Sequence, residues 1–115
     1  MPDDHKITIA PAERRVKVTW RGHVVADSAS ALSLKEHVYP PVLYIPRKDV
    51  DMTLLERTPS HTTCPYKGEA SYYSLKADGV VEKDAVWTYE TPFPGVASIK
   101  EHLAFYPNKV EIAEG

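Results

Sequence analysis

Apolar and polar residues alternate along much of the chain, which is the pattern of β-strands that bury one face. In residues 15–20, for example, Val16, Val18 and Trp20 fall on one side of an extended chain, with polar residues between them. An Arg-Gly turn signal follows, and the next segment, residues 23–26, resumes as an apolar run. Glycine allows the positive φ of a tight turn, so this stretch predicts an antiparallel hairpin.

The same alternation, or a high content of β-forming residues, recurs in several other segments. These segments are residues 6–10, 41–46, 69–76, 85–90 and 109–113. The pattern in residues 28–37 is compatible with either a strand or a short helix, and it favours a strand or irregular structure. Residues 98–103 (SIKEHL) are the best helix candidate, and Asp49 or Asp51 could cap one helical turn. The chain, residues 1–115, is therefore predicted to be a single mainly-β domain of seven to nine short strands, with one or two short helices.

The composition of the chain excludes some classes of partner from the predicted function. The net charge of −2 shows no basic excess of the kind that phosphate binding requires, so no nucleic-acid partner is expected. The longest apolar stretch, residues 38–46, is short and broken by prolines, so no membrane partner is expected either. The first ten residues lack the basic and apolar regions of a secretory signal, which makes the cytoplasm the expected location.

The sequence also gives little indication of a metal site or a disulfide bond. The one cysteine, Cys64, excludes an intramolecular disulfide and any zinc site that needs paired thiolates. The five histidines show no HxH or HExxH spacing. Neither a metal nor a cofactor is predicted.

Cys64 and Lys67 form the first candidate site. They lie in the segment TTCPYKG, residues 62–68, where proline presets φ for a turn and glycine follows it. An ammonium close to the thiol would favour the reactive thiolate, which suggests a catalytic pair. His61 is a doubtful base for Cys64, because an offset of three points it to the opposite face of a strand. The alternative is that Cys64 is a small buried side chain and the segment only builds a turn.

Arg47 and Asp49 form a second candidate site, just beyond the strand predicted for residues 41–46. The planar guanidinium of Arg47 suits a carboxylate or phosphate, and Asp49 could orient it. Glu36 could pair with Arg47 or with Lys67. The alternative is a solvated turn whose ion pair contributes little.

The aromatic residues form a third candidate. Trp87 and Tyr89 lie two apart on one strand face, and Tyr44, Tyr72 and Tyr106 could converge with them. An aromatic-lined concavity with a few polar groups is typical of a small-molecule pocket, and a flat or heteroaromatic ligand would suit it. The alternative is that these rings build the core.

Several strings, in this order, resemble the domain of unknown function 427 family. They are VVADSASALSLKEH (24–37), YIPRKDVD (44–51), TTCPYKGEASYYSL (62–75), AVWTYETP (85–92) and AFYPNKVEI (104–112). The resemblance covers residues 7–112, and the combination of YIPR, TxCPYKG and WxYxxP is specific.

The resemblance implies a fold and no established activity. The implied fold is a compact, strongly bent antiparallel β-structure similar to the β-tent group, which includes methionine sulfoxide reductase B and the drug-binding domain of cereblon. Many β-tent proteins bind zinc through two CxxC pairs, and this sequence has neither pair. A shared fold does not by itself carry a function.

The sequence therefore predicts a domain that binds a small aromatic or anionic ligand. The predicted ligand-binding residues are Tyr44, Arg47, Asp49, Tyr72, Trp87 and Tyr89. One alternative is a cysteine-dependent enzyme of thiol redox or transfer chemistry that uses Cys64 with Lys67. It would need an outside thiol to reset it, because no second cysteine is present. Another alternative is a protein-interaction module, including a homo-oligomer that pairs through an exposed edge strand.

Overall fold

The computed structural model describes residues 6–115 as ten β-strands and three short 3₁₀ helices. The first five residues, which begin the segment inspected for a secretory signal, lie outside the described part. In chain order the elements are β1 (Ile7–Pro11), β2 (Val16–Trp20), β3 (His23–Ser28), β4 (Leu32–Glu36), β5 (Val42–Pro46), η1 (Arg47–Asp49), η2 (Met52–Leu54), β6 (Leu55–Cys64), β7 (Gly68–Ala77), β8 (Val80–Thr88), η3 (Pro94–Ile99), β9 (His102–Phe105) and β10 (Glu111–Glu114). The prediction of a mainly-β, antiparallel fold is confirmed.

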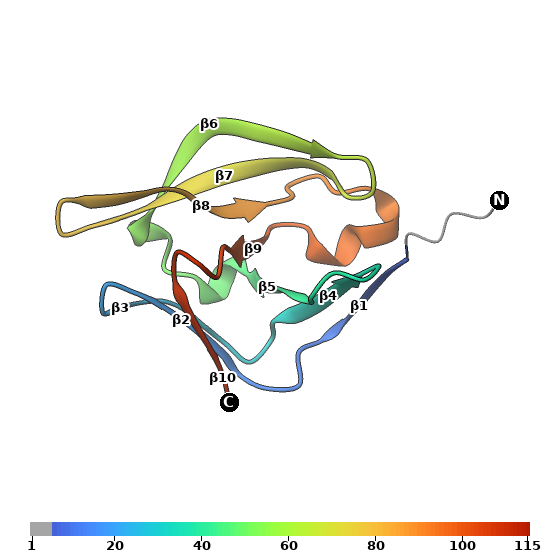
Figure 1. Cartoon of the computed structure of the whole chain (residues 1–115), viewed down its shortest axis with the longest axis horizontal. Coiled ribbons are helices and arrows are strands. Elements are labelled where there is room, and N and C mark those ends of the chain that lie inside the picture. Colours follow the sequence, from blue (N-terminus) through green and yellow to red (C-terminus); the bar gives the residue numbers. More distant parts are fainter. Residues whose placement is uncertain (1–5) are drawn as a thin grey trace.

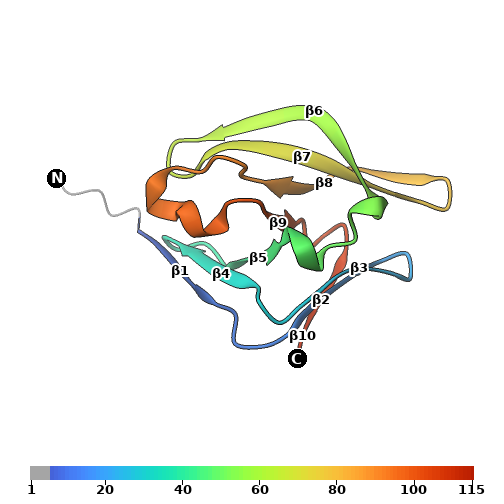
Figure 2. The ribbon, with the colours of Figure 1, turned by 180° about the vertical axis from the view of Figure 1, so that it is seen from behind.

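The strands form two antiparallel sheets. The large sheet has the order β1-β4-β5-β9-β8-β7-β6, and the small sheet has the order β10-β2-β3. Figures 1 and 2 show the large sheet strongly bent, with β6, β7 and β8 on one limb, β4 and β1 on the other, and η3 between the limbs. The small sheet, built on the predicted hairpin of β2 and β3, lies beside the second limb.

Adjacent residues of one strand enter different cores because strand side chains alternate between faces. In β7, Tyr73 packs in the cluster that joins the two sheets, together with Val18 and Phe105. Its neighbour Tyr72 packs in a second cluster inside the bend, together with Ile99 of η3. The bend therefore gives the large sheet two buried surfaces, and the inner one is rich in tyrosine.

β-Bulges mark the bent limb of the large sheet. The pairing register shifts between Arg57 and His61 of β6, and again between Tyr73 and Leu75 of β7. Asp84 of β8, at φ 51, lies opposite the second shift. Bulges bend strands and increase their local twist, so they account for the curvature of this limb.

The helix predicted for residues 98–103 is wrong. η3 ends at Ile99, and β9 begins at His102. Between them Lys100, at ψ 128, leaves the helical conformation, and Glu101 has φ 55, a left-handed conformation. Ile99 and Leu103 are both fully buried, but Leu103 is buried as a strand residue paired with Ile45 and Thr88. The helix-like spacing of Ile99 and Leu103 therefore arises from two buried residues on different elements, η3 and β9.

Two further predictions concerned residues 28–37 and a helix cap at Asp49 or Asp51. Residues 28–37 contain the strand β4, which was the favoured alternative. The side chain of Asp51 accepts a hydrogen bond from the amide of Thr53 and caps η2. No helix within residues 6–115 has the length and apolar character needed to cross a membrane.

Candidate functional site

A hollow of about 240 Å³ lies inside the bend of the large sheet. Its walls carry five aromatic side chains, two aliphatic side chains and one acid–base pair. They are Leu34, Glu36, Val42, Tyr44, Lys67, Tyr72, Trp87, Tyr89 and Tyr106. We refer to this space as the aromatic hollow.

Strand register brings the aromatic residues together. Trp87 of β8 pairs directly with Tyr72 of β7 on one side and with Ala104 of β9 on the other. Paired residues point to the same face of a sheet, so the two rings share the inner face, and the small Ala104 side chain leaves space beside them. Tyr44 reaches the same space from β5. The predicted convergence of tyrosines on Trp87 is present in the structure.

The rings hold one another through specific contacts. The centroids of Trp87 and Tyr106 lie 4.6 Å apart, and the Trp87 and Tyr44 rings meet edge to face at 6.3 Å. The Nε1–H of Trp87 donates a hydrogen bond to the Tyr44 hydroxyl at 3.3 Å. The Tyr72 hydroxyl lies 2.8 Å from the Oγ1 of Thr62. The aromatic wall is therefore ordered by contacts made within the protein.

The hydroxyls of Tyr44, Tyr89 and Tyr106 are neutral near pH 7. Burial raises the pKa of Tyr44 to about 12. Burial, with the neighbouring Tyr72 hydroxyl, raises the pKa of Tyr106 to about 12. The pKa of Tyr89 is also raised, again mainly by burial. Each hydroxyl can thus both donate and accept a hydrogen bond in the hollow.

Lys67 and Glu36 form a nearly buried ion pair in the wall. The Nζ of Lys67 donates to the Oε1 of Glu36 at 2.5 Å, and the two side chains are only 10% and 18% exposed. Lys67 is held in place by the turn between β6 and β7, where Gly68 takes φ 117. Of the two partners that the sequence left open for Glu36, Lys67 is the one observed. The two charges compensate each other, and both remain in the wall of the hollow.

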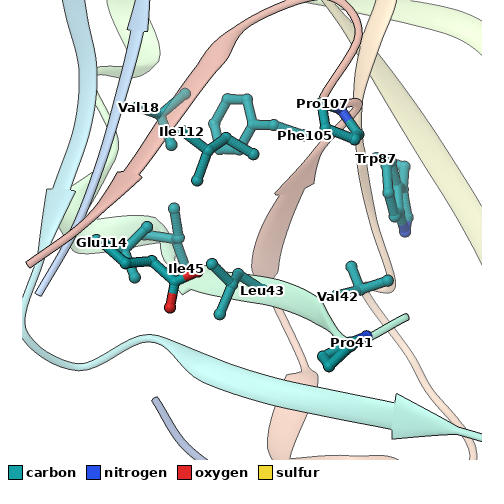
Figure 3. A pocket seen from close by; sticks show the side chains of 11 residues that line it. Val18, Pro41, Val42, Leu43, Ile45, Trp87, Phe105, Pro107, Ile112 and Glu114 are labelled. Atoms are coloured by element: carbon teal, nitrogen blue, oxygen red, sulfur yellow. The ribbon is translucent and has the colours of Figure 1, made fainter. Parts of the chain in front are cut away.

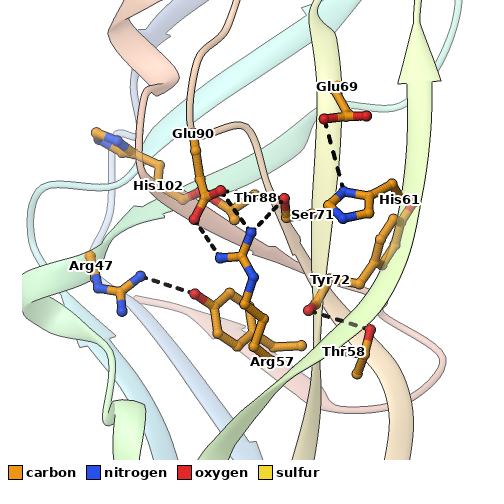
Figure 4. Close-up of polar contacts among 11 residues, drawn as sticks. Arg47, Arg57, Thr58, His61, Glu69, Ser71, Tyr72, Thr88, Glu90 and His102 are labelled. Carbon is orange, nitrogen blue, oxygen red and sulfur yellow. Dashed lines mark hydrogen bonds and ion pairs between the residues drawn. The ribbon is translucent and has the colours of Figure 1, made fainter.

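The side chains of Cys64 and Lys67 do not form a hydrogen-bonded pair, although the two residues are close in sequence. Cys64 ends β6 opposite Gly68 and is half-buried against the inner cluster. The ammonium of Lys67 bonds to Glu36, and no hydrogen bond joins it to Cys64 in the described part of the chain. His61 pairs with Ser71 and faces away from Cys64, with Nδ1 4.0 Å from the Oε1 of Glu69 (Figure 4).

Arg47 and Asp49 do not line the aromatic hollow. Both lie in η1, where the Nη1 of Arg47 donates to the Tyr73 hydroxyl at 3.2 Å. Tyr73 belongs to the opposite face of the sheet from Tyr72. Asp49 accepts a hydrogen bond from the Ser28 hydroxyl at 2.6 Å, and this bond is the main cause that lowers the pKa of Asp49. The two predicted residues are therefore placed away from the hollow and have different partners.

A polar cluster on the outer face was not anticipated from the sequence. Arg57 donates to both carboxylate oxygens of Glu90, at 2.6 and 2.9 Å, and to the Ser71 hydroxyl (Figure 4). The bond from Arg57 is the main cause that lowers the pKa of Glu90. The guanidiniums of Arg47 and Arg57 both lie about 6 Å from the Tyr73 ring centroid. These residues are distant in sequence and match no local motif, so only the fold brings them together.

The described residues contain no group of three or more His, Cys, Asp or Glu side chains that could hold a metal ion.

The fold and this site together define a mainly-β domain with an aromatic hollow inside a bent antiparallel sheet. Residues 8–114 match the model of a family described as a domain of unknown function (DUF427). The match covers most of the chain, so the chain belongs to this family, and the resemblance found in the sequence is confirmed. A comparison with curated proteins found no significant match.

Proposed function

We propose that this chain is a small-molecule-binding domain and that the aromatic hollow holds a flat, heteroaromatic ligand. The observation that carries the proposal is a hollow of about 240 Å³ whose wall combines five aromatic side chains with the Glu36–Lys67 ion pair. Ligand sites are typically concave, largely apolar and supplied with a few fixed polar groups. Aromatic ring contacts contribute about 0.5–1.5 kcal/mol each beyond the area that they bury.

The charges in the wall favour a neutral ring over an anion. The ammonium of Lys67 would attract an anion, but its charge is compensated by Glu36. Arg47, a predicted ligand-binding residue, contacts Tyr73 on the opposite face of the sheet. A neutral heterocycle needs only hydrogen bonds at its edge, and the tyrosine hydroxyls and the ion pair supply both donors and acceptors.

Trp87 is the residue on which a test can be built. It is half-buried and lines the hollow, whereas Trp20, the other tryptophan, is buried in β2 of the small sheet. In ¹H–¹⁵N spectra the two indole N–H groups give separate signals, so Trp20 serves as an internal control. We would titrate the labelled protein with quinoline, indazole and adenine, and assign the signals with Trp20→Phe.

Binding in the hollow should shift the Trp87 indole signal and leave the Trp20 signal unchanged. Trp87→Ala should abolish binding and leave the circular dichroism spectrum of a folded β protein. Trp87→Phe, which keeps a ring, should retain weakened binding. Titrations that move neither indole signal, or both equally, would speak against a ligand in this hollow.

A further inference from the structure

A second hollow, of about 280 Å³, lies between the two sheets. It is bounded by β5, β8 and β9 of the large sheet and by β2 and β10 of the small sheet (Figure 3). Its lining residues are Val16, Val18, Pro41, Val42, Leu43, Ile45, Trp87, Phe105, Pro107, Ile112 and Glu114. Ten of these eleven residues carry no charge. The eleventh, Glu114, is exposed. We refer to this space as the inter-sheet hollow.

The backbone pairing of the large sheet is short at the point where the two hollows approach each other. β5 pairs with β9 only through Ile45 with Leu103 and Pro46 with His102. Residues 42–44 of β5 pair with β4 alone. Beyond these two pairs the ladder between β5 and β9 stops, so residues 42–44 have no paired residue in β9.

Two side chains, Val42 and Trp87, are shared by the two hollows. Both line the aromatic hollow on the inner face and the inter-sheet hollow on the outer side. Both are only half-buried. The two hollows thus share the side chains of Val42 and Trp87 as a common wall.

The combined volume of the two hollows suits a ligand larger than either would hold. Ligand pockets generally measure roughly 300–1,000 Å³. The aromatic hollow, at about 240 Å³, and the inter-sheet hollow, at about 280 Å³, each fall below this range, and the two together fall within it.

We propose that the two hollows form one bipartite site for an amphipathic ligand that combines a flat ring with an alkyl tail. The ring lies among the tyrosines, with its polar edge toward Glu36 and Lys67. The tail passes Val42 and Trp87, which line both hollows, and lies between the sheets, where the side chains of Val18, Phe105 and Ile112 offer no hydrogen bond. This inference rests on the proposed function, because it assigns the ring to the same aromatic hollow.

The test compares quinoline with a series of 2-alkylquinolines, from methyl to heptyl, by isothermal titration calorimetry. Burial of each methylene between the sheets should tighten binding about fourfold until the inter-sheet hollow is full. Ile112→Phe adds volume to that hollow from the edge strand β10. It should remove the gain from the tail and leave the dissociation constant of quinoline within about twofold. Ile112→Val, the matched control, should keep the gain.

A second measurement does not depend on any variant. In the wild-type protein, nuclear Overhauser effects should connect the tail of heptylquinoline to methyl groups of Val18 and Ile112, and its ring to Tyr72. This readout keeps the inference testable if Ile112→Phe does not fold.

Three outcomes would overturn the inference, and they differ in what they leave standing. If quinoline binds but the tail adds no affinity, the site is limited to the aromatic hollow and the proposed function stands. If tailed compounds bind with contacts to Ile112 but not to Tyr72, the inter-sheet hollow acts alone, and both proposals are wrong. If neither quinoline nor its alkyl derivatives bind, both are again wrong.

Discussion

The Nζ of Lys67 lies 2.5 Å from the Oε1 of Glu36, and this contact joins two limbs of one bent sheet. Glu36 ends β4, near one edge of the strand order, and Lys67 lies in the turn that connects β6 and β7 at the other edge. No backbone ladder connects these strands directly. The ion pair is therefore both a wall of the aromatic hollow and a tie across the bend.

Removing one partner of this pair should cost more stability than removing both. Lys67→Met leaves the Glu36 carboxylate almost buried without its cation, and we expect a loss of about 3 kcal/mol in the free energy of unfolding. The double variant Lys67→Met, Glu36→Leu leaves no buried charge, so it should recover at least half of that loss. Urea unfolding of the wild type, both single variants and the double variant measures the coupling. Additive losses would show that the pair is not coupled.

The inner aromatic face was predictable from the sequence, and the ion pair was not. Tyr72 and Trp87 lie on strands with clear alternation, so periodicity and strand pairing explain why both side chains lie on the same face of the sheet. Lys67 and Glu36 lie in a turn and at a strand end, 31 positions apart. Only the bend of the sheet brings them together, and no local pattern encodes that bend. The same limit applies to Arg47, whose position beyond a strand end was predicted but whose contact with Tyr73 was not.

Asp84 should contribute stability that depends on pH in the acid range. Its carboxylate accepts hydrogen bonds from the hydroxyls of Thr58, at 2.7 Å, and Ser60, at 2.8 Å, and so connects the bulges of β6 and β8. The bond from Thr58 is the main cause that lowers the pKa of Asp84 below its ordinary value of 3.8. Because the folded pKa is the lower one, the contribution is fully present above about pH 4–5 and is lost as the pH falls through the folded pKa.

Asp84→Asn tests this contribution. At pH 7 the variant should be less stable than the wild type by about 1–2 kcal/mol, because hydrogen bonds to a charged acceptor are lost. The difference should shrink from pH 7 into the acid range, as the pH falls through the folded pKa and the wild-type carboxylate becomes protonated as well. Urea unfolding across this range measures it. Glu56→Gln, which removes an exposed ion pair with Lys76, is the control and should have little effect. A deficit that is equal at pH 7 and pH 3 would contradict the assignment.

The buried tyrosines should resist ionisation in alkali. The pKa values of Tyr44 and Tyr106 are raised to about 12, mainly by burial, so both hydroxyls stay protonated near pH 11 in the folded protein. In the unfolded chain they ionise near pH 10, so they should lower the free energy of unfolding as the pH rises from about 10 to 12. Absorbance at 295 nm should show a delayed rise, and Tyr44→Phe should remove one delayed tyrosine. A single transition near pH 10 that accounts for all seven tyrosines would contradict these values.

The least predictable element of the fold was β6. Its sequence, LERTPSHTTC, contains few apolar residues and one proline, Pro59, so it shows no alternation. β6 is an edge strand that is mostly exposed along its length, and an edge strand tolerates proline because one side of its backbone is unpaired. The helix that was wrongly predicted at residues 98–103 has a different cause. There an apolar spacing typical of a helix was produced by two buried positions on different elements.

Cys64 should behave as an ordinary, partly protected thiol. Its side chain is half-buried against the inner cluster, and the nearest candidate for activation, the ammonium of Lys67, is bound to Glu36. Reaction with iodoacetamide at pH 7.5 should therefore be slower in the folded protein than in protein unfolded in urea. Glu36→Gln is the informative variant, because it removes the carboxylate that now binds Lys67. A faster reaction in that variant would show that Glu36 withholds the cation from Cys64. A folded wild-type protein that reacts faster than the unfolded chain would instead show an activated thiolate, and the interpretation as a cysteine-dependent enzyme would then replace that of a binding domain.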